Sequence, residues 1–234
     1  MSDSILFLVD SPLFGIFLTV LTFVLADRLT KIINKPYITQ LFLMMVILIT
    51  FFAVTGIDLD YYQQGGDMIT FLIGPMTIAL AMPIYRERHI LAEYFIPILG
   101  AIAVGAVVAL VSGYALGKLV GLDKSVILSL LPKNTTTGIA QELSLAIKGD
   151  SPLTIALVII AGNTGYMFAS TVYSLTRIEH PVAKGVALGT SSHAVGTKRA
   201  LELGETEGAV SSAAIGVAGM ITTFLLPAAL ALMF

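Results

Sequence analysis

The chain contains no cysteine and no tryptophan, and charged residues are scarce. Without cysteine, disulfide bonds, thiolate metal sites and cysteine nucleophiles are all excluded. Only 12% of the 234 residues are charged, whereas soluble domains carry about 25%. The net charge of −2, with the basic residues spread over short loops, argues against nucleic-acid binding. Apolar residues make up 56% of the chain and the mean hydropathy is +0.92, which indicates a membrane protein.

Six segments are apolar enough, at about 20 residues each, to cross a bilayer as helices. They are 11–33, 38–56, 68–85, 94–118, 152–174 and 208–233. The N-terminus lacks the basic region and cleavage site of a secretory signal, so we expect the first segment to be retained. No hydrophilic stretch approaches the size of a domain. The sequence therefore predicts an all-α polytopic membrane protein with a single integral-membrane domain over residues 1–234.

Two further segments, 124–148 and 182–203, have small and polar residues at the centre, where a normal span is most apolar. The first reads "LLPKNTTTG" and the second "ALGTSSHAVGTKR". Each segment either crosses the membrane completely or enters and leaves on one side as a re-entrant hairpin. Two hairpins that enter from opposite faces give a slightly stronger bias of lysine and arginine toward one side.

The orientation follows from the basic residues of the short loops. Loops 27–37 and 86–93 are rich in lysine and arginine, whereas the loop between them carries Asp58, Asp60 and Asp67. This alternation predicts a multi-pass protein of the inner (cytoplasmic) membrane with the N-terminus outside. Both topologies of the two polar segments also place the C-terminus outside.

The first polar segment has the features of a helix that is interrupted inside the membrane. Pro132 cannot donate a backbone hydrogen bond, and Gly138 permits unusual backbone angles. A half-helix that begins near Thr137 would direct its free amides, with their partial positive charge, into the gap. Lys133 would add a full positive charge, which is costly in a membrane and therefore indicates function. We predict an anion site that includes Lys133, Asn134, Thr135, Thr136 and Thr137, with helix packing as the alternative role of the threonines.

The second polar segment repeats this pattern. Gly189 and Gly196 bracket a run of small polar residues, and a helix that restarts after Ser192 would again direct amides at the gap. His193 is either a hydrogen-bonded interior histidine or a proton carrier. The candidate binding residues of this segment are Ser191, Ser192, His193, Gly196 and Thr197.

Two isolated polar residues are further candidates. Asn163, in the middle of span 152–174, either bridges helices or lines the site. Thr77 lies in span 68–85, which prolines are expected to kink so that Thr77 faces inward. The two polar segments are each followed by an apolar span that contains Ala-Gly, which suggests an internal repeat.

Three separated motifs resemble the LrgB/CidB family of bacterial and plastid membrane proteins. They are "LLPKNTTTGIA", "GPMTIALAMPIY" and "LGTSSHAVGTKRALELGETEGAVSS", and the resemblance extends from about residue 12 to the end. The first motif departs from the common form, which has proline where this chain has Gly138. The family was first described as holin- and antiholin-like modulators of murein hydrolase export and cell lysis. Its plastid members are glycolate/glycerate translocators, and some bacterial members take up pyruvate.

The resemblance implies a secondary transporter of small monocarboxylates of the pyruvate, glycolate or glycerate class. The alternative is a holin/antiholin-like modulator of murein hydrolase activity and cell lysis. The resemblance also implies a small LrgA/CidA-type membrane partner. We expect an elevator-type carrier, by analogy, working as a homodimer with proton or sodium coupling. No cofactor, metal or nucleic acid is expected.

An intramembrane enzyme is the third hypothesis, with Ser191 or Ser192 as nucleophile and His193 as base. Adjacent residues on a helix point in different directions, which is poor geometry for proton transfer. No carboxylate in that stretch would orient the histidine. We therefore predict that the protein is not an enzyme.

Overall fold

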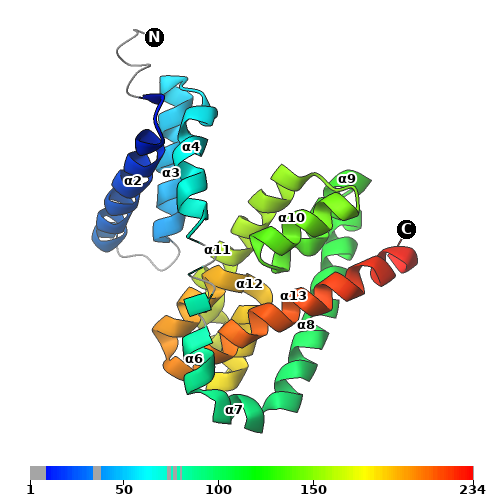
Figure 1. The fold of residues 1–234 in the computed structure, drawn as a ribbon. Coiled ribbons are helices and arrows are strands. Elements are labelled where there is room, and N and C mark those ends of the chain that lie inside the picture. The colour runs from blue at the N-terminus through cyan, green and yellow to red at the C-terminus, as the bar shows by residue number, and fades with distance from the viewer. Residues whose placement is uncertain (1–8, 34–37, 73–74, 76–77, 80, 234) are drawn as a thin grey trace. The chain divides into compact units, whose positions relative to one another are not determined.

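The computed structural model describes residues 9–33, 38–72, 75, 78–79 and 81–233, and all regular structure among them is helical (Figure 1). In this described part of the chain, four helices are long and apolar enough to cross a membrane: α2 (Pro12–Ile33), α8 (Phe95–Leu119), α11 (Ser151–Thr176) and α13 (Glu205–Met233). They coincide closely with four of the six predicted spans. A fifth span corresponds to α3 (Gln40–Thr55), an apolar helix of 16 residues. The all-α membrane fold is confirmed.

The remaining predicted span, 68–85, lies partly outside the described residues, and its described part is interrupted by a turn at 71–72. Helix α4 (Leu59–Thr70) begins in polar sequence, because the Asp58 side chain accepts a hydrogen bond from the Asp60 amide and caps the helix. It ends before a turn, and the short helices α6 (Ala81–Arg86) and α7 (Arg88–Glu93) follow. Thr77 lies outside the described residues.

The chain divides into two compact units, Met1–Ala79 and Leu80–Phe234. In the first unit, α2 and α4 meet at a pair of glycines. A Cβ atom on Gly15 would collide with the backbone of Gly65, and one on Gly65 would collide with the backbone of Gly15. The Thr19 and Tyr62 hydroxyls lie 3.0 Å apart across the same contact. Small residues thus let these two helices pack closely, as in many membrane proteins.

The first polar segment forms a helical hairpin in the second unit. It consists of α9 (Lys124–Leu130), the 3₁₀-helix η1 (Leu131–Asn134) and α10 (Thr137–Ala146), and we call it the first hairpin. Its two arms meet at Thr154 of α11, whose Oγ1 lies 3.0 Å from the Ser129 carbonyl oxygen and 2.7 Å from Ser144 Oγ. A continuous helix would hold Ser129 and Ser144 about 22 Å apart, so the chain reverses between them.

We expect the Thr154 hydroxyl to stabilise the first hairpin. The Thr154→Val change keeps the shape of the side chain and leaves buried polar groups without a partner, at a cost of about 1–3 kcal/mol. Thermal unfolding in detergent should show a lower midpoint for Thr154→Val. Thr164→Val, on the exposed side of the same helix, removes only a bond to the Ile160 carbonyl and should have little effect. Equal midpoints for the two variants would contradict the role of Thr154.

The second polar segment, α12 (Pro181–Leu203), is also a hairpin, which we call the second hairpin. Its helix is interrupted at His193, whose φ of 42° and ψ of −134° are not helical. A Cβ on Gly196 would lie 2.5 Å from the Leu188 carbonyl oxygen, whereas a straight helix would separate residues 188 and 196 by about 12 Å. The first limb (181–192) and the second limb (194–203) therefore lie side by side.

The contacts along α8 show that the two hairpins point at each other. In the N-terminal half of α8, Ile98 packs in one cluster with Val182 at the base of the second hairpin. Further along α8, Gly105 faces Thr190 near the tip of the second hairpin. Gly113 then faces Lys133 at the tip of the first hairpin, and Gly117 faces Ile127 in its first arm. Along α8 the contacts thus pass from the base of the second hairpin to its tip, and then from the tip of the first hairpin toward its base. Both polar segments are re-entrant relative to α8.

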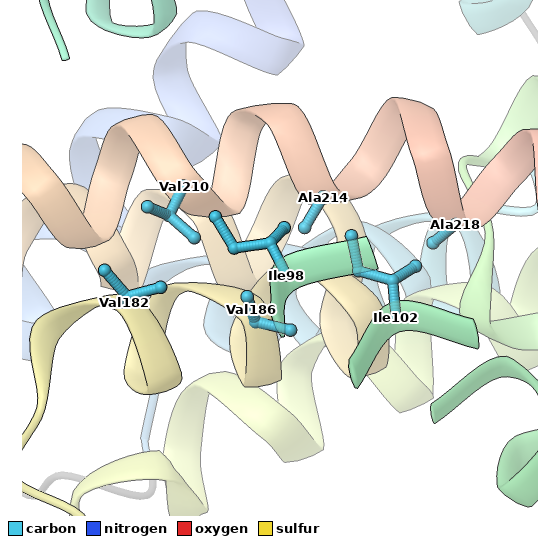
Figure 2. Packing of buried hydrophobic residues seen from close by; sticks show 7 residues of the cluster. All are labelled: Ile98, Ile102, Val182, Val186, Val210, Ala214 and Ala218. Atoms are coloured by element: carbon cyan, nitrogen blue, oxygen red, sulfur yellow. The ribbon is translucent and has the colours of Figure 1, made fainter. Parts of the chain in front are cut away.

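Each hairpin has its own hydrophobic core against α8 and α13. Figure 2 shows the core of the second hairpin, where Ile98 and Ile102 of α8 lie between α13 and the first limb of α12. Its buried members are Ile98, Ile102, Val182, Val186, Val210, Ala214 and Ala218. The core of the first hairpin contains Leu110, Leu128, Leu131, Leu143 and Leu226. The long helices thus hold both tips at the middle of the unit.

Candidate functional site

One hydrogen bond joins the two hairpin tips. Asn134, the last residue of η1, donates from Nδ2 to the carbonyl oxygen of Ser191, at 3.1 Å. Non-helical backbone at such a depth persists in membrane proteins only where protein or a water-filled cavity surrounds it. The tips meet near the middle of α11, since the His193 ring packs against Gly162 of this 26-residue helix. Two polar segments far apart in sequence therefore lie against each other at their tips.

The threonines of the first tip set its local geometry. The Thr135 amide and hydroxyl both donate to the Pro132 carbonyl oxygen, at 3.1 and 2.9 Å, and hold Thr135 in an extended conformation. The Thr136 hydroxyl caps α10 by accepting from the Ile139 amide. The new helix begins at Thr137, as the sequence predicted. The Thr137 side chain is exposed.

Several polar side chains of the second hairpin are engaged by the surrounding helices. The His193 Nε2 atom lies 2.9 Å from the Val158 carbonyl oxygen, and the Thr197 hydroxyl lies 2.7 Å from Ser211 Oγ of α13. Ser192 is fully buried against Gly165 of α11. Gly196 provides the close contact between the two limbs. These residues hold the tip of the second hairpin in place. Of the residues predicted in this hairpin, Ser191 lines the cavity that is described below.

Asn163 lies at the same level, in the middle of α11. It is 8% exposed, and its Nδ2 donates to the Ile159 carbonyl oxygen of its own helix at 3.1 Å. It does not belong to the lining of the cavity. Asn163 therefore lies near the tips, in the helix α11 that packs against them.

A cavity of about 790 Å³ opens between α8 and the first limb of α12. Its polar end is formed at the tips by Asn134, Thr190 and Ser191, together with Ser112 of α8. Among the described residues, two buried oxygens of these side chains, Asn134 Oδ1 and Thr190 Oγ1, have no hydrogen-bond partner. A buried polar group without a partner costs about 1–3 kcal/mol, so each one calls for a functional explanation. Both oxygens are shielded from solvent, although their residues line the cavity.

Lys133 lies at the tip of the first hairpin and does not belong to the lining of the cavity. Lys133 is half-buried, and its Nζ lies 3.3 Å from where a Cβ on Gly113 would be, one residue from Ser112. Within the described part of the chain, Nζ has no carboxylate within ion-pair distance and no hydrogen-bond acceptor. An ammonium group without a partner at the meeting point of the two tips is suited to binding an anion.

Sequence reasoning did not select Thr190 or Ser112. Thr190 is part of the run "GTSSHAVGT", but the pattern could not distinguish which residues of this run line the cavity. Ser112 is a single hydroxyl in an apolar span, and nothing local marks it as functional.

The family model of the LrgB-like family matches residues 19–232, nearly the whole chain. The protein belongs to the LrgB-like family. The resemblance inferred from the three motifs is therefore confirmed. The match includes both hairpins and the three long helices that frame them. No solved structure gives a significant match to this chain.

Membership of the LrgB-like family agrees with the long apolar helices in indicating a membrane protein. It is consistent with either a transporter or a regulator of murein hydrolases. The arrangement of the LrgB-like hairpins bears on that choice, because interrupted helices that meet at the centre of a bundle are a recurrent feature of secondary transporters.

Proposed function

We propose that this LrgB-like protein is a secondary transporter of small monocarboxylates, such as pyruvate, glycolate or glycerate. The observation that carries the proposal is the meeting point of two re-entrant hairpins beside the cavity. Among the described residues, one lysine there has no anionic partner and two buried side-chain oxygens have no hydrogen-bond partner. A structural core would not retain these three groups, since each lowers stability when left without a partner.

In this proposal the carboxylate binds the Lys133 ammonium group and the first amides of α10. The Asn134 Oδ1 atom can only accept, so it suits a substrate hydroxyl such as that of glycolate or glycerate. Thr190 Oγ1 can donate to a substrate oxygen as well as accept, and would serve a hydroxyl or the keto group of pyruvate equally. Thr135, Thr136, Ser192 and Thr197 act by holding the tips in place, and Ser191 completes the wall.

The whole site lies in the unit Leu80–Phe234, which would be the moving part of an elevator-type carrier. His193 is the candidate for proton coupling, because its ring lies behind the tip of the second hairpin. We further propose a homodimer in the inner membrane with both termini outside. A small LrgA/CidA-type membrane protein is the expected partner.

The proposal is tested by removing one hydroxyl that no protein group uses. Thr190→Val keeps the shape and takes away an unsatisfied buried group, so the thermal stability should stay equal or rise. Uptake of labelled glycolate into proteoliposomes should nevertheless fall about tenfold or more, which corresponds to one lost hydrogen bond to a charged or polar ligand. Thr164→Val is the matched control and should transport normally. Unchanged uptake by Thr190→Val, or no uptake of any short carboxylate by the wild-type protein, would refute the proposal.

A further inference from the structure

The two hairpins belong to two segments of equal length. The first repeat, residues 124–176, comprises the first hairpin and α11, and the second repeat, residues 181–233, comprises the second hairpin and α13. A shift of 57 residues, from 124 to 181, carries the first repeat onto the second from end to end. The same shift carries the Ala-Gly pair 161–162 of α11 onto the pair 218–219 of α13. The two repeats therefore align without a gap.

Corresponding residues of α11 and α13 also make corresponding contacts. Thr154 Oγ1 of α11 lies 2.7 Å from Ser144 Oγ, in the second arm of the first hairpin. Ser211 of α13 corresponds to Thr154 under the shift, and its Oγ lies 2.7 Å from Thr197 Oγ1, in the second limb of the second hairpin. Each long helix is thus hydrogen-bonded in the same way to the second half of its own hairpin.

The two hairpin tips meet at corresponding residues. Asn134 and Ser191 correspond under the shift, and the Asn134 Nδ2 atom donates to the Ser191 carbonyl oxygen. Residues that a two-fold rotation relates can contact their own counterparts only close to the rotation axis. Gly162 of α11 faces the tip of the second hairpin, and the corresponding Gly219 of α13 faces the start of α10 in the first hairpin. The repeats therefore contact each other reciprocally.

Helix α8 lies across the axis of this relation. Gly113 of α8 faces Lys133 and Gly105 faces Thr190, and Lys133 and Thr190 correspond under the shift. The two glycines are four residues to either side of Ala109. Because the hairpins point at each other along α8, a two-fold rotation about an axis near Ala109 exchanges their contacts. Inverted repeats of this kind, related by an axis in the membrane plane, are a recurrent feature of secondary transporters.

The two repeats differ in how closely their hairpins pack against α8. On the side of the second hairpin, the cavity of about 790 Å³ opens between α8 and the first limb of α12. On the side of the first hairpin, a Cβ on Gly117 would lie 2.9 Å from the Ile127 side chain, and Ile127 and Leu131 are each 1% exposed. The contact of α8 with α9 is therefore closed, whereas its counterpart across the axis opens into a cavity.

We propose that a second access route to the hairpin tips runs between α8 and α9 and opens when the cavity beside the second hairpin closes. Each repeat then takes the arrangement that the other has in this structure, so the tips are reached from the opposite side of the membrane. The route passes Gly117, Ile127 and Leu131 and ends at Lys133. The nature of the ligand rests on the proposed function, whereas the route rests on the contacts of the two repeats.

A disulfide across the closed contact tests this route. The natural chain has no cysteine, and a Cβ on Gly117 would lie 3.8 Å from Ile127 Cβ, the usual separation in a disulfide. Gly117→Cys combined with Ile127→Cys should therefore be cross-linked by copper phenanthroline. The cross-linked protein should lose glycolate uptake into proteoliposomes but still bind labelled glycolate in detergent, and reduction should restore uptake. Uptake that complete cross-linking leaves unchanged, or loss of binding together with uptake, would overturn the proposal.

Sided labelling tests the route independently of the substrate. Ala101→Cys places a thiol in the cavity, and Leu131→Cys places one at the closed contact, beside Gly113. A membrane-impermeant maleimide should alkylate Ala101→Cys from one side of the membrane and Leu131→Cys from the other. Val158→Cys, at a fully buried position of α11, is the control and should stay unlabelled.

Two results of the labelling would overturn the proposal. One is alkylation of both thiols from the same side, and the other is a Leu131→Cys thiol that reacts no faster than that of Val158→Cys. Labelling from opposite sides in a protein that takes up no short carboxylate would refute the proposed function and support the second route. Normal uptake by a protein that fails both tests of the route would do the reverse.

Discussion

Lys133→Met should abolish glycolate uptake, lowering its efficiency at least about 100-fold. The methionine keeps the apolar stem beside Gly113 and removes only the charge. An ammonium group about 4 Å from a carboxylate contributes about 4 kcal/mol at the effective dielectric constant of a partly buried site. Because Lys133 has no anionic partner among the described residues, its removal leaves no other charge exposed to the membrane interior.

The measurement is initial uptake of labelled glycolate into proteoliposomes that contain equal amounts of folded protein. Lys133→Met should be as stable as the wild-type protein or more stable, since it removes a costly half-buried charge. Lys148→Met removes an exposed lysine at the base of the same hairpin and should transport normally. Near-normal uptake by Lys133→Met would show that this lysine does not bind the substrate.

Gly189→Ala should lower the midpoint of thermal unfolding by about 2–12 °C, which is the second large effect that we expect. An added Cβ would lie 2.5 Å from the Ser211 carbonyl oxygen and 2.8 Å from Ala214 Cβ, so the first limb of α12 and α13 would have to separate. Gly185, one turn earlier, makes the same kind of contact with Glu207 and Val210, which gives a small-xxx-small packing face. Overpacking of this kind costs about 1–3 kcal/mol, and about 2–4 °C per kcal/mol is usual for chains of this size.

Gly216→Ala is the control for this prediction. Gly216 lies on α13, the helix against which Gly189 packs, but an added Cβ on Gly216 meets no atom within 4 Å. The substitution should leave the midpoint unchanged or raise it slightly, because alanine favours helix over glycine by about 1 kcal/mol. Thermal unfolding of both variants in the same detergent provides the comparison. If both behave alike, the close packing of α12 on α13 is not required for stability.

The backbone of the site could be predicted from the sequence because few residues control it. Pro132 and the capping threonine Thr136 fix the interruption of the first hairpin, and the restart at Thr137 follows from them. The restart of the second hairpin after Ser192 was also correctly predicted, and the structure puts the non-helical residue at His193. Short-range steric and hydrogen-bonding rules suffice at these points.

The side chains that face the cavity could not be predicted in the same way. Thr190, Ser191 and Ser192 are adjacent small hydroxyl residues, and only tertiary packing decides which is turned toward α11 and which toward α8. The choice between crossing and re-entrant segments likewise depended on long-range contacts, such as those of Gly105 with Thr190 and Gly113 with Lys133. The helix that starts at Leu59 was missed because its sequence is mostly polar, so that it does not stand out as a membrane span, and because its Asp58 cap is a local signal.

The most direct test of the account uses the absence of cysteine from the natural chain. Ser191→Cys introduces a single thiol at the cavity wall, between the two tips, and its alkylation rate by a small water-soluble maleimide can be measured in membranes. We predict that glycolate at ten times its half-saturating concentration slows the alkylation about tenfold, by occupying the site. The same protection should be absent when Lys133→Met is combined with Ser191→Cys. An alkylation rate that glycolate leaves unchanged, in a Ser191→Cys protein that still transports, would contradict a carboxylate site at the hairpin tips.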